Sequence, residues 1–335
     1  MCGSVRRFHK ALLVPMLWGI LGVGCLKAAE PQEEVVQAEE IVQVERPTVA
    51  GRIFDVDVSM DNYLFARAAA AVFGGSWGSP IQTPEELEER TWEDLILSYE
   101  AFRRGVVVPQ EKVDEEIGKL LKAEKVAFDW KQDRPAFEAW VKGRVGEPAV
   151  LFENQLKHLI QLKMLRDEVR ESFEPEVSEE EALAKYITEY NSLELQMVRF
   201  DTLAEAEAYA AKVKKQPKVW ERDFKRNEKN KDYIKTTGFV SFEWLLDAWK
   251  VPRNDLDAML KLEGGAFYGP TPLYKGYAVH KVLQKRPAVP EEFDEKKKEQ
   301  YLERVKTIKQ FKELEKWQEQ LFELADKEVY VKSGR

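Results

Sequence analysis

Few residues of this chain have the chemistry of a nucleophile, a general base or a metal ligand. The only cysteines are Cys2 and Cys25, and the histidines are His9, His158 and His280. The chain after residue 30 therefore has no thiolate nucleophile, no disulfide and no cysteine-bound metal. Two widely separated histidines do not form a histidine-rich metal site, and no His-Glu-x-x-His motif is present. We predict neither a metal nor a cofactor.

The most informative histidine is His280, which lies near the end of the stretch 264–282, Gly-Gly-Ala-Phe-Tyr-Gly-Pro-Thr-Pro-Leu-Tyr-Lys-Gly-Tyr-Ala-Val-His-Lys-Val. A helix-like run, 256–262, stops at a glycine pair, and two prolines then favour an extended segment. After Gly276 the residues 277–283 alternate between apolar and polar, which predicts a strand. On that strand Ala278 and His280 are two residues apart and therefore point to the same face.

The composition limits the class of protein. The chain has 335 residues, of which 33% are charged and 44% hydrophobic, with a net charge of −8. This length suffices for two domains with a core in each, and the composition is that of a helix-rich globular protein. The negative charge argues against general nucleic-acid binding, which needs a basic surface. No nucleotide-binding loop is present to drive an ATP cycle.

The N-terminal 29 residues are predicted to be a signal peptide. Basic residues precede an apolar run, 11–24, that is too short for a membrane span. The segment Leu-Gly-Val-Gly before Cys25 is similar to a bacterial lipobox with its leucine one position early, which would make Cys25 a lipidation site. The alternative is cleavage after Ala28 or Ala29. Either reading predicts a periplasmic or other extracytoplasmic protein, with a lipid or signal anchor as its contact with a membrane.

The residues after the signal peptide are predicted to form a tether and then a first folded domain. Residues 30–50 are rich in Glu, Gln and Val and are typical of a flexible tether. Residues 51–59 alternate as in a strand, whose Asp55 and Asp57 we interpret as a solvated face rather than a carboxylate site. Asp61 is expected to cap a helix, 62–73, and Thr83 to cap the next, with a further helix over 92–104.

The following segments resemble the N-terminal chaperone domain of SurA-type proteins. The resemblance rests on Arg-Gly-Val-Val-Val-Pro-Gln-Glu-Lys-Val-Asp at 104–114, a short helix near 137–141 and a long amphipathic helix, 150–169. His158 is expected to be a core or boundary histidine of that helix. Ser178 and Glu181 form a capping box for a further helix that ends at Tyr190. In the family, such a segment joins the chaperone domain to a parvulin domain.

The region 189–288 resembles a parvulin-type (PpiC) peptidyl-prolyl isomerase domain that has lost its catalytic residues. The family's two histidines align with Gln196 and Ala278, and its acidic or thiol residue aligns with Asn227. Isomerisation requires a fixed hydrogen-bond network around a twisted amide whose barrier is about 18–20 kcal/mol. These residue types do not reproduce that network. His280 is the one candidate substitute.

The resemblance also implies an apolar pocket for a substrate side chain in this region. The family's pocket positions fall on Val251 and Leu256, and Phe267 is added as a third lining residue. We therefore expect the parvulin-like domain to serve as a scaffold for binding or spacing.

The C-terminal residues 289–335 are expected to return to the first domain. They comprise a charged helix, 291–326, and a short strand, 328–331. The whole is identified as a SurA/PpiD-like chaperone of the α+β class. Its helical domain (51–188) is completed by the C-terminal segment, and the parvulin-like domain, a small antiparallel sheet with helices, is inserted between them.

This resemblance implies an ATP-independent chaperone that binds unfolded polypeptides, including outer-membrane proteins during outer-membrane biogenesis. Two alternatives stay open at this point. One is an active but divergent peptidyl-prolyl cis-trans isomerase that uses Gln196, Asn227 and His280. The other is a structural lipoprotein or assembly subunit that binds one specific partner.

Overall fold

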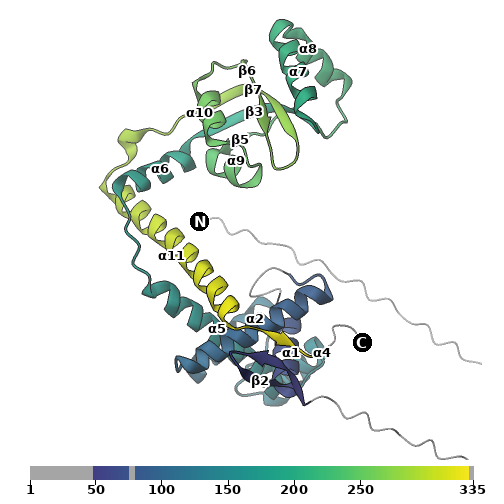
Figure 1. Cartoon of the computed structure of the whole chain (residues 1–335), viewed down its shortest axis with the longest axis vertical. Helices are drawn as coiled ribbons and strands as arrows, with labels where there is room; N and C mark the ends of the chain where they lie inside the picture. Colours follow the sequence, from purple (N-terminus) through teal and green to yellow (C-terminus); the bar gives the residue numbers. More distant parts are fainter. Residues whose placement is uncertain (1–47, 75–79, 332–335) are drawn as a thin grey trace, which may run out of the picture. The chain divides into compact units, whose positions relative to one another are not determined.

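The computed structural model describes residues 48–74 and 80–331, and its helices and two antiparallel sheets confirm the predicted α+β class (Figure 1). The helices are α1 (Met60–Phe73), α2 (Pro84–Arg103), α3 (Gln110–Ala123), α4 (Arg134–Val145), α5 (Ala149–Ser172), α6 (Glu179–Tyr190), α7 (Leu203–Lys215), α8 (Lys218–Arg226), α9 (Phe242–Ala248), α10 (Arg253–Lys261) and α11 (Glu295–Leu324). The strands are β1 (Val49–Ile53), β2 (Val56–Ser59), β3 (Ser192–Phe200), β4 (Tyr233–Ile234), β5 (Phe239–Ser241), β6 (Phe267–Pro272), β7 (Tyr277–Arg286) and β8 (Glu328–Val329).

The predicted signal peptide, including Cys25, lies outside the described residues, as does most of the tether. The predicted tether, 30–50, ends too late, because Val49 and Ala50 already belong to β1 and Ala50 is fully buried. No helix within 48–74 or 80–331 is long and apolar enough to cross a membrane.

The first hydrophobic core is mostly helical. Apolar residues at helical spacing bury one face of each helix, as Val113, Ile117 and Leu121 do on α3. At the centre lies Trp92 on α2, which is 1% exposed and whose indole N–H donates to Glu88 Oε1 at 2.8 Å. Helices α1 to α5 and the β1–β2 hairpin all contribute buried residues to this core.

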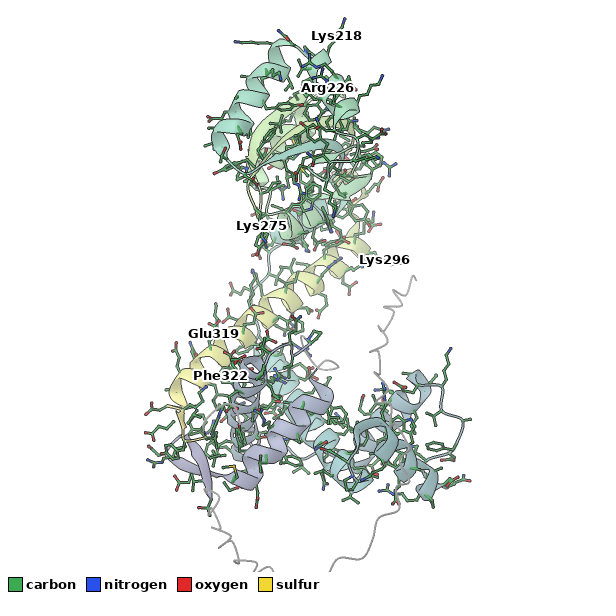
Figure 2. The ribbon with its side chains drawn as sticks, turned by 90° about the vertical axis from the view of Figure 1, so that its right-hand side faces the viewer. Lys218, Arg226, Lys275, Lys296, Glu319 and Phe322 are labelled. Atoms are coloured by element: carbon green, nitrogen blue, oxygen red, sulfur yellow. The ribbon has the colours of Figure 1, made fainter. Side chains whose placement is uncertain are left out.

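The C-terminal segment completes this first core. Leu314, Leu321 and Ala325 from the end of α11 are buried in it, and β8 pairs antiparallel with β1 at the edge opposite β2. Figure 2 labels Phe322, which packs against the core, and Glu319, which is exposed one turn earlier on α11. Residues from the two ends of the described chain therefore share one core.

Four local predictions in this region need correction. The strand predicted over 51–59 is a hairpin, because Phe54 and Asp55 adopt positive φ angles of 49° and 61° and turn the chain. Helix α1 is capped by Ser59, whose side chain accepts from the Asn62 N–H, and not by Asp61. The helices predicted from Thr83 and over 92–104 are one helix, α2, for which Thr83 is the cap. The predicted C-terminal helix begins later, at Glu295.

The second sheet has the order β4-β3-β7-β6, with β5 also paired to β3. Buried residues on one of its faces pack against α7 and α8, and those on the other pack against α9 and α10. These helices can be followed around the sheet in Figure 1. The central pair, β3 and β7, contributes Val198 and Val279 to the core on the α7–α8 face, and Leu193, Leu195 and Val282 to the core on the α9–α10 face.

Helix α6 contributes no buried residue to the first core or to the two cores of the second sheet. It begins at the predicted capping box, in which Ser178 and Glu181 bond reciprocally. Its buried Tyr186 packs on Tyr301 of α11, with ring centroids 5.5 Å apart, and its hydroxyl donates to the Val289 carbonyl at 3.2 Å. The sequence assigned α6 to the domain 51–188, but the buried residues of α6 pack on α11 and not in the first core.

Candidate functional site

The pairing of β3 with β7 decides which of the predicted site residues can meet. Ala278 lies opposite Arg199 and His280 opposite Met197, whereas Gln196 lies opposite Lys281. Directly opposite residues share a face and neighbours along a strand alternate. Ala278 and His280 therefore lie on the face covered by α9 and α10, and Gln196 lies on the other. The expectation that Gln196 and Ala278 occupy one site is therefore wrong, because they lie on opposite faces of the sheet.

Gln196 and Asn227 have structural partners. The Gln196 Oε1 accepts a hydrogen bond of 2.8 Å from the indole N–H of Trp220 on α8. The Asn227 side chain donates to the Asp223 carbonyl at 2.9 Å and ends the same helix. Both residues thus stabilise the α7–α8 side of the sheet, away from Ala278 and His280.

His280 is placed where it cannot act on a bound polypeptide. Its side chain is 0% exposed, and neither ring nitrogen has a hydrogen-bond partner among the described residues. Burial lowers the pKa of His280 from 6.5 to about 4, because the charged imidazolium is poorly solvated there. The ring is therefore neutral at pH 7, and no carboxylate orients it as a general base would require.

The three predicted pocket residues are also divided between the two faces. Val251 and Leu256 are 1% and 0% exposed, in the core formed with α9 and α10. Phe267 packs on the other side against Trp220, with ring centroids 5.1 Å apart. The residue of β6 that does face α10 is Tyr268, whose hydroxyl donates to Asp255 Oδ1 at 2.9 Å. Sequence reasoning missed Tyr268 because it did not foresee the register of β6 on β7.

A hollow of about 170 Å³ lies on the α9 side of the sheet near Ala278. Its lining residues are Met197, Arg199, Ile234, Ala248, Trp249, Leu273, Tyr274 and Lys275. Lys275, labelled in Figure 2, lies in the turn between β6 and β7. Arg199 is paired with Asp232 at 3.0 Å. The lining carries no carboxylate, imidazole or thiol, so the hollow has the chemistry of a small binding surface rather than of a proton-transfer site.

A larger apolar site lies in the helical region. Two hollows of about 340 Å³ and 490 Å³ share Phe65, Phe102 and His158 in their walls. We call them together the apolar groove. The first is lined further by Ile53, Val56, Asp57, Val58, Asn62, Ala66, Leu95, Ser98 and Tyr99. The second is lined further by Gly105, Val106, Val107, Val108, Asn154, Lys157 and Gln161.

The apolar groove is bordered by exposed hydrophobic side chains. Phe102 is 83% exposed and Val107 is 76% exposed, although both neighbour buried core residues. The chain reaches Val107 by leaving α2 at Gly105, whose positive φ of 69° suits a residue without a Cβ atom. Hydrophobic side chains that remain open beside a hollow mark a surface for another apolar molecule. The sequence predicted a helix over 92–104 but did not identify Phe102 as exposed.

His158 forms part of the wall of the groove. Its Nδ1 lies 3.2 Å from the Ser98 hydroxyl oxygen, and the edge of its ring meets Phe65, with centroids 5.5 Å apart. Burial, and secondarily the nearby Arg166 charge, lower the pKa of His158 to about 4. A neutral imidazole fits an apolar wall, in agreement with the expected boundary position.

Comparisons with known proteins find similarity among solved structures. No protein-family model matches the chain, and no curated protein matches it. A SurA-like chaperone of Campylobacter jejuni is matched over 85% of this chain and 100% of that one, at 14% identity and a TM-score of 0.38. The peptidylprolyl isomerase PrsA of Bacillus anthracis is matched over 67% of this chain and 95% of that one, at 16% identity and a TM-score of 0.39.

PrsA of Bacillus cereus is matched over 83% of this chain and 92% of that one, at 14% identity and a TM-score of 0.37. These three structures are a SurA-like chaperone and two PrsA peptidylprolyl isomerases. At such TM-scores these likenesses define no activity for this chain.

Proposed function

We propose that the protein is an ATP-independent chaperone that holds unfolded polypeptides in the apolar groove. The observation that carries this proposal is the pair of exposed side chains, Phe102 and Val107, beside two adjoining hollows. No cofactor is needed, because holding an unfolded segment requires affinity and no chemical step.

The energy for holding comes from burial of apolar surface. Fully burying a side chain such as Phe or Val stabilises a complex by about 1.5–3 kcal/mol relative to leaving it in water. Phe102 and Val107 are both largely exposed in the free protein, so most of that gain is available to a bound segment. The net charge of −8 keeps the complex soluble through repulsion between copies.

The test is suppression of aggregation by the full chain. The client is a chemically unfolded outer-membrane protein diluted from urea, and light scattering reports its aggregation. The double variant Phe102→Ser, Val107→Ser should need at least about tenfold more protein for the same suppression, because two apolar contacts are lost. Leu324→Ser is the matched control, since Leu324 is 72% exposed but lies outside the groove. Equal suppression by all three proteins would refute the proposal.

We further propose that the parvulin-like domain is not catalytic. The supporting observations are that Gln196 and Ala278 lie on opposite faces and that His280 is fully buried. In a protease-coupled assay on a prolyl peptide, the full chain should give no rate above the uncatalysed background. A measurable rate that is lost in His280→Ala would favour the alternative of a divergent isomerase instead.

Clients in the outer membrane and an anchor at Cys25 form the remaining part of the proposal. The outer-membrane clients follow from the resemblance to SurA-type chaperones, and the anchor follows from the lipobox-like segment before Cys25. Metabolic labelling with a radioactive fatty acid should label the full chain and not Cys25→Ala. A single stoichiometric partner, recovered without any suppression of aggregation for unrelated clients, would instead indicate a structural assembly subunit.

A further inference from the structure

One edge of the first sheet has no partner strand within 48–74 and 80–331, and it borders the apolar groove. The strand order β2-β1-β8 makes β2 an edge strand, and Val56, Asp57 and Val58 of β2 line the groove. An edge strand presents backbone N–H and C=O groups that can pair with another extended chain. The groove therefore combines apolar walls with a backbone template.

The hairpin register identifies which backbone groups are free. Ile53 and Val56 flank the two-residue turn, so they form a hydrogen-bonded pair. The next pair, Arg52 and Asp57, is then non-hydrogen-bonded, and its backbone groups point outward. On the β1 side this agrees with the pairing of Arg52 with Glu328 of β8. On the β2 side the Asp57 N–H and C=O have no backbone partner among the described residues.

The side chains around this edge suit an extended apolar segment. Val56 is 45% exposed, and Phe102, 83% exposed, lines the same hollow. The Asp57 carboxylate is neutralised by Arg52, whose Nε lies 3.2 Å from its Oδ1, so it does not place an unpaired charge beside an apolar partner. A strand added here would direct alternate side chains toward Phe102 and the others away from it.

We infer that the client segment binds as an added β-strand along β2, with its backbone bonded to Asp57 and its alternate apolar side chains in the groove. This inference rests on the proposed chaperone function and adds the conformation of the bound segment. The groove thereby selects extended segments of alternating pattern and accepts many sequences, because backbone pairing is independent of side-chain identity.

The test uses full-length protein and a fluorescent peptide of nine residues that alternates Val and Thr. Two further peptides carry N-methyl groups on either the odd or the even residues. One methylated peptide should bind about tenfold more weakly than the parent, because its lost N–H groups are those that face β2, while the other binds as the parent does. Equal affinities for the two methylated peptides would overturn strand addition. No binding of the parent peptide, together with no suppression of aggregation, would instead refute the proposed function.

A matched pair of variants locates the edge. Asp57→Pro removes the outward N–H, and a proline is tolerated on an edge strand when its N–H side faces solvent. Asp57→Ala removes the same carboxylate and keeps the N–H. Peptide affinity should fall about tenfold in Asp57→Pro relative to Asp57→Ala. Unchanged far-ultraviolet circular dichroism would show that both variants are folded, and equal affinities in the two folded variants would exclude the β2 edge as the docking strand.

Discussion

Replacing Gly51 by alanine tests whether the C-terminal strand is an integral part of the first core. A Cβ atom at Gly51 would lie 2.2 Å from the Glu328 carbonyl oxygen and 2.6 Å from Cη2 of Trp92. Cβ atoms essentially never approach other heavy atoms more closely than 3.0 Å. Either β8 or Trp92 must therefore move in the variant.

Either movement lowers the free energy of unfolding. Trp92 is 1% exposed and anchored to Glu88, so it has no space into which to shift. Moving β8 weakens its pairing with β1 and the two hydrogen bonds that the Ala50 carbonyl accepts, from the N–H of Tyr330 at 2.9 Å and of Val331 at 3.2 Å. Overpacking of a core typically costs about 1–3 kcal/mol, and we expect the upper end, about 3 kcal/mol, because both neighbours are fixed.

The measurement is urea denaturation of the full chain, followed by tryptophan fluorescence, together with hydrogen exchange at the Tyr330 amide. Gly118→Ala on α3 is the control, since a Cβ atom there meets nothing within 4 Å. It should raise the free energy of unfolding by about 0.5–1 kcal/mol, the usual gain from Gly to Ala inside a helix. A Gly51→Ala protein as stable as the parent, with a protected Tyr330 amide, would refute the close packing of β1, β8 and Trp92.

Three further predictions concern stability. Burial lowers the pKa of His280 to about 4, so between pH 6.5 and 4 the unfolded chain binds a proton that the folded chain does not. The free energy of unfolding therefore falls as the pH falls through that range. His280→Leu should flatten this pH dependence in urea denaturation, leaving the part due to His158. Ser178→Ala should lower the free energy of unfolding by about 1 kcal/mol, since it removes a cap, whereas no change would contradict the capping box. Trp220→Phe should cost about 1–2 kcal/mol beyond packing, because the Gln196 oxygen loses its donor, and Gln196→Leu in the same background should recover part of it.

Local signals in the sequence were sufficient for many of the elements and for some of their ends. The caps at Thr83 and Ser178 each depend on a few neighbouring residues, and the structure contains both. The hairpin at Phe54 and Asp55 was missed because neither is glycine or asparagine, the residues that usually signal a turn with positive φ angles.

The faces of the sheet were harder to predict than its strands. The pairing shifts between Tyr268 and Thr271 in β6 and between Glu194 and Leu195 in β3. Each such irregularity breaks the simple alternation, so residues counted from one end of a strand are assigned to the wrong face beyond it. Gln196 was assigned from the family alignment and Phe267 was added as a pocket residue, and neither assignment used the register of the strands. The irregularity in β6 falls at Gly269 and Pro270, residue types that often mark a bulge, whereas no such residue marks the one in β3.

The apolar groove depends on what the neighbouring elements leave uncovered. Leu95, Tyr99 and Phe102 recur on one side of α2, and their spacing alone predicts equal burial. Leu95 is nevertheless 8% exposed and Phe102 83% exposed. Phe102 lies in the last turn of α2, three residues before the chain turns away at Gly105, so fewer segments are left to cover it. The same helix thus buries Leu95 and Ala101 in the core and leaves Phe102 exposed. Under the proposed function, a client contacts Phe102 without displacing a core residue.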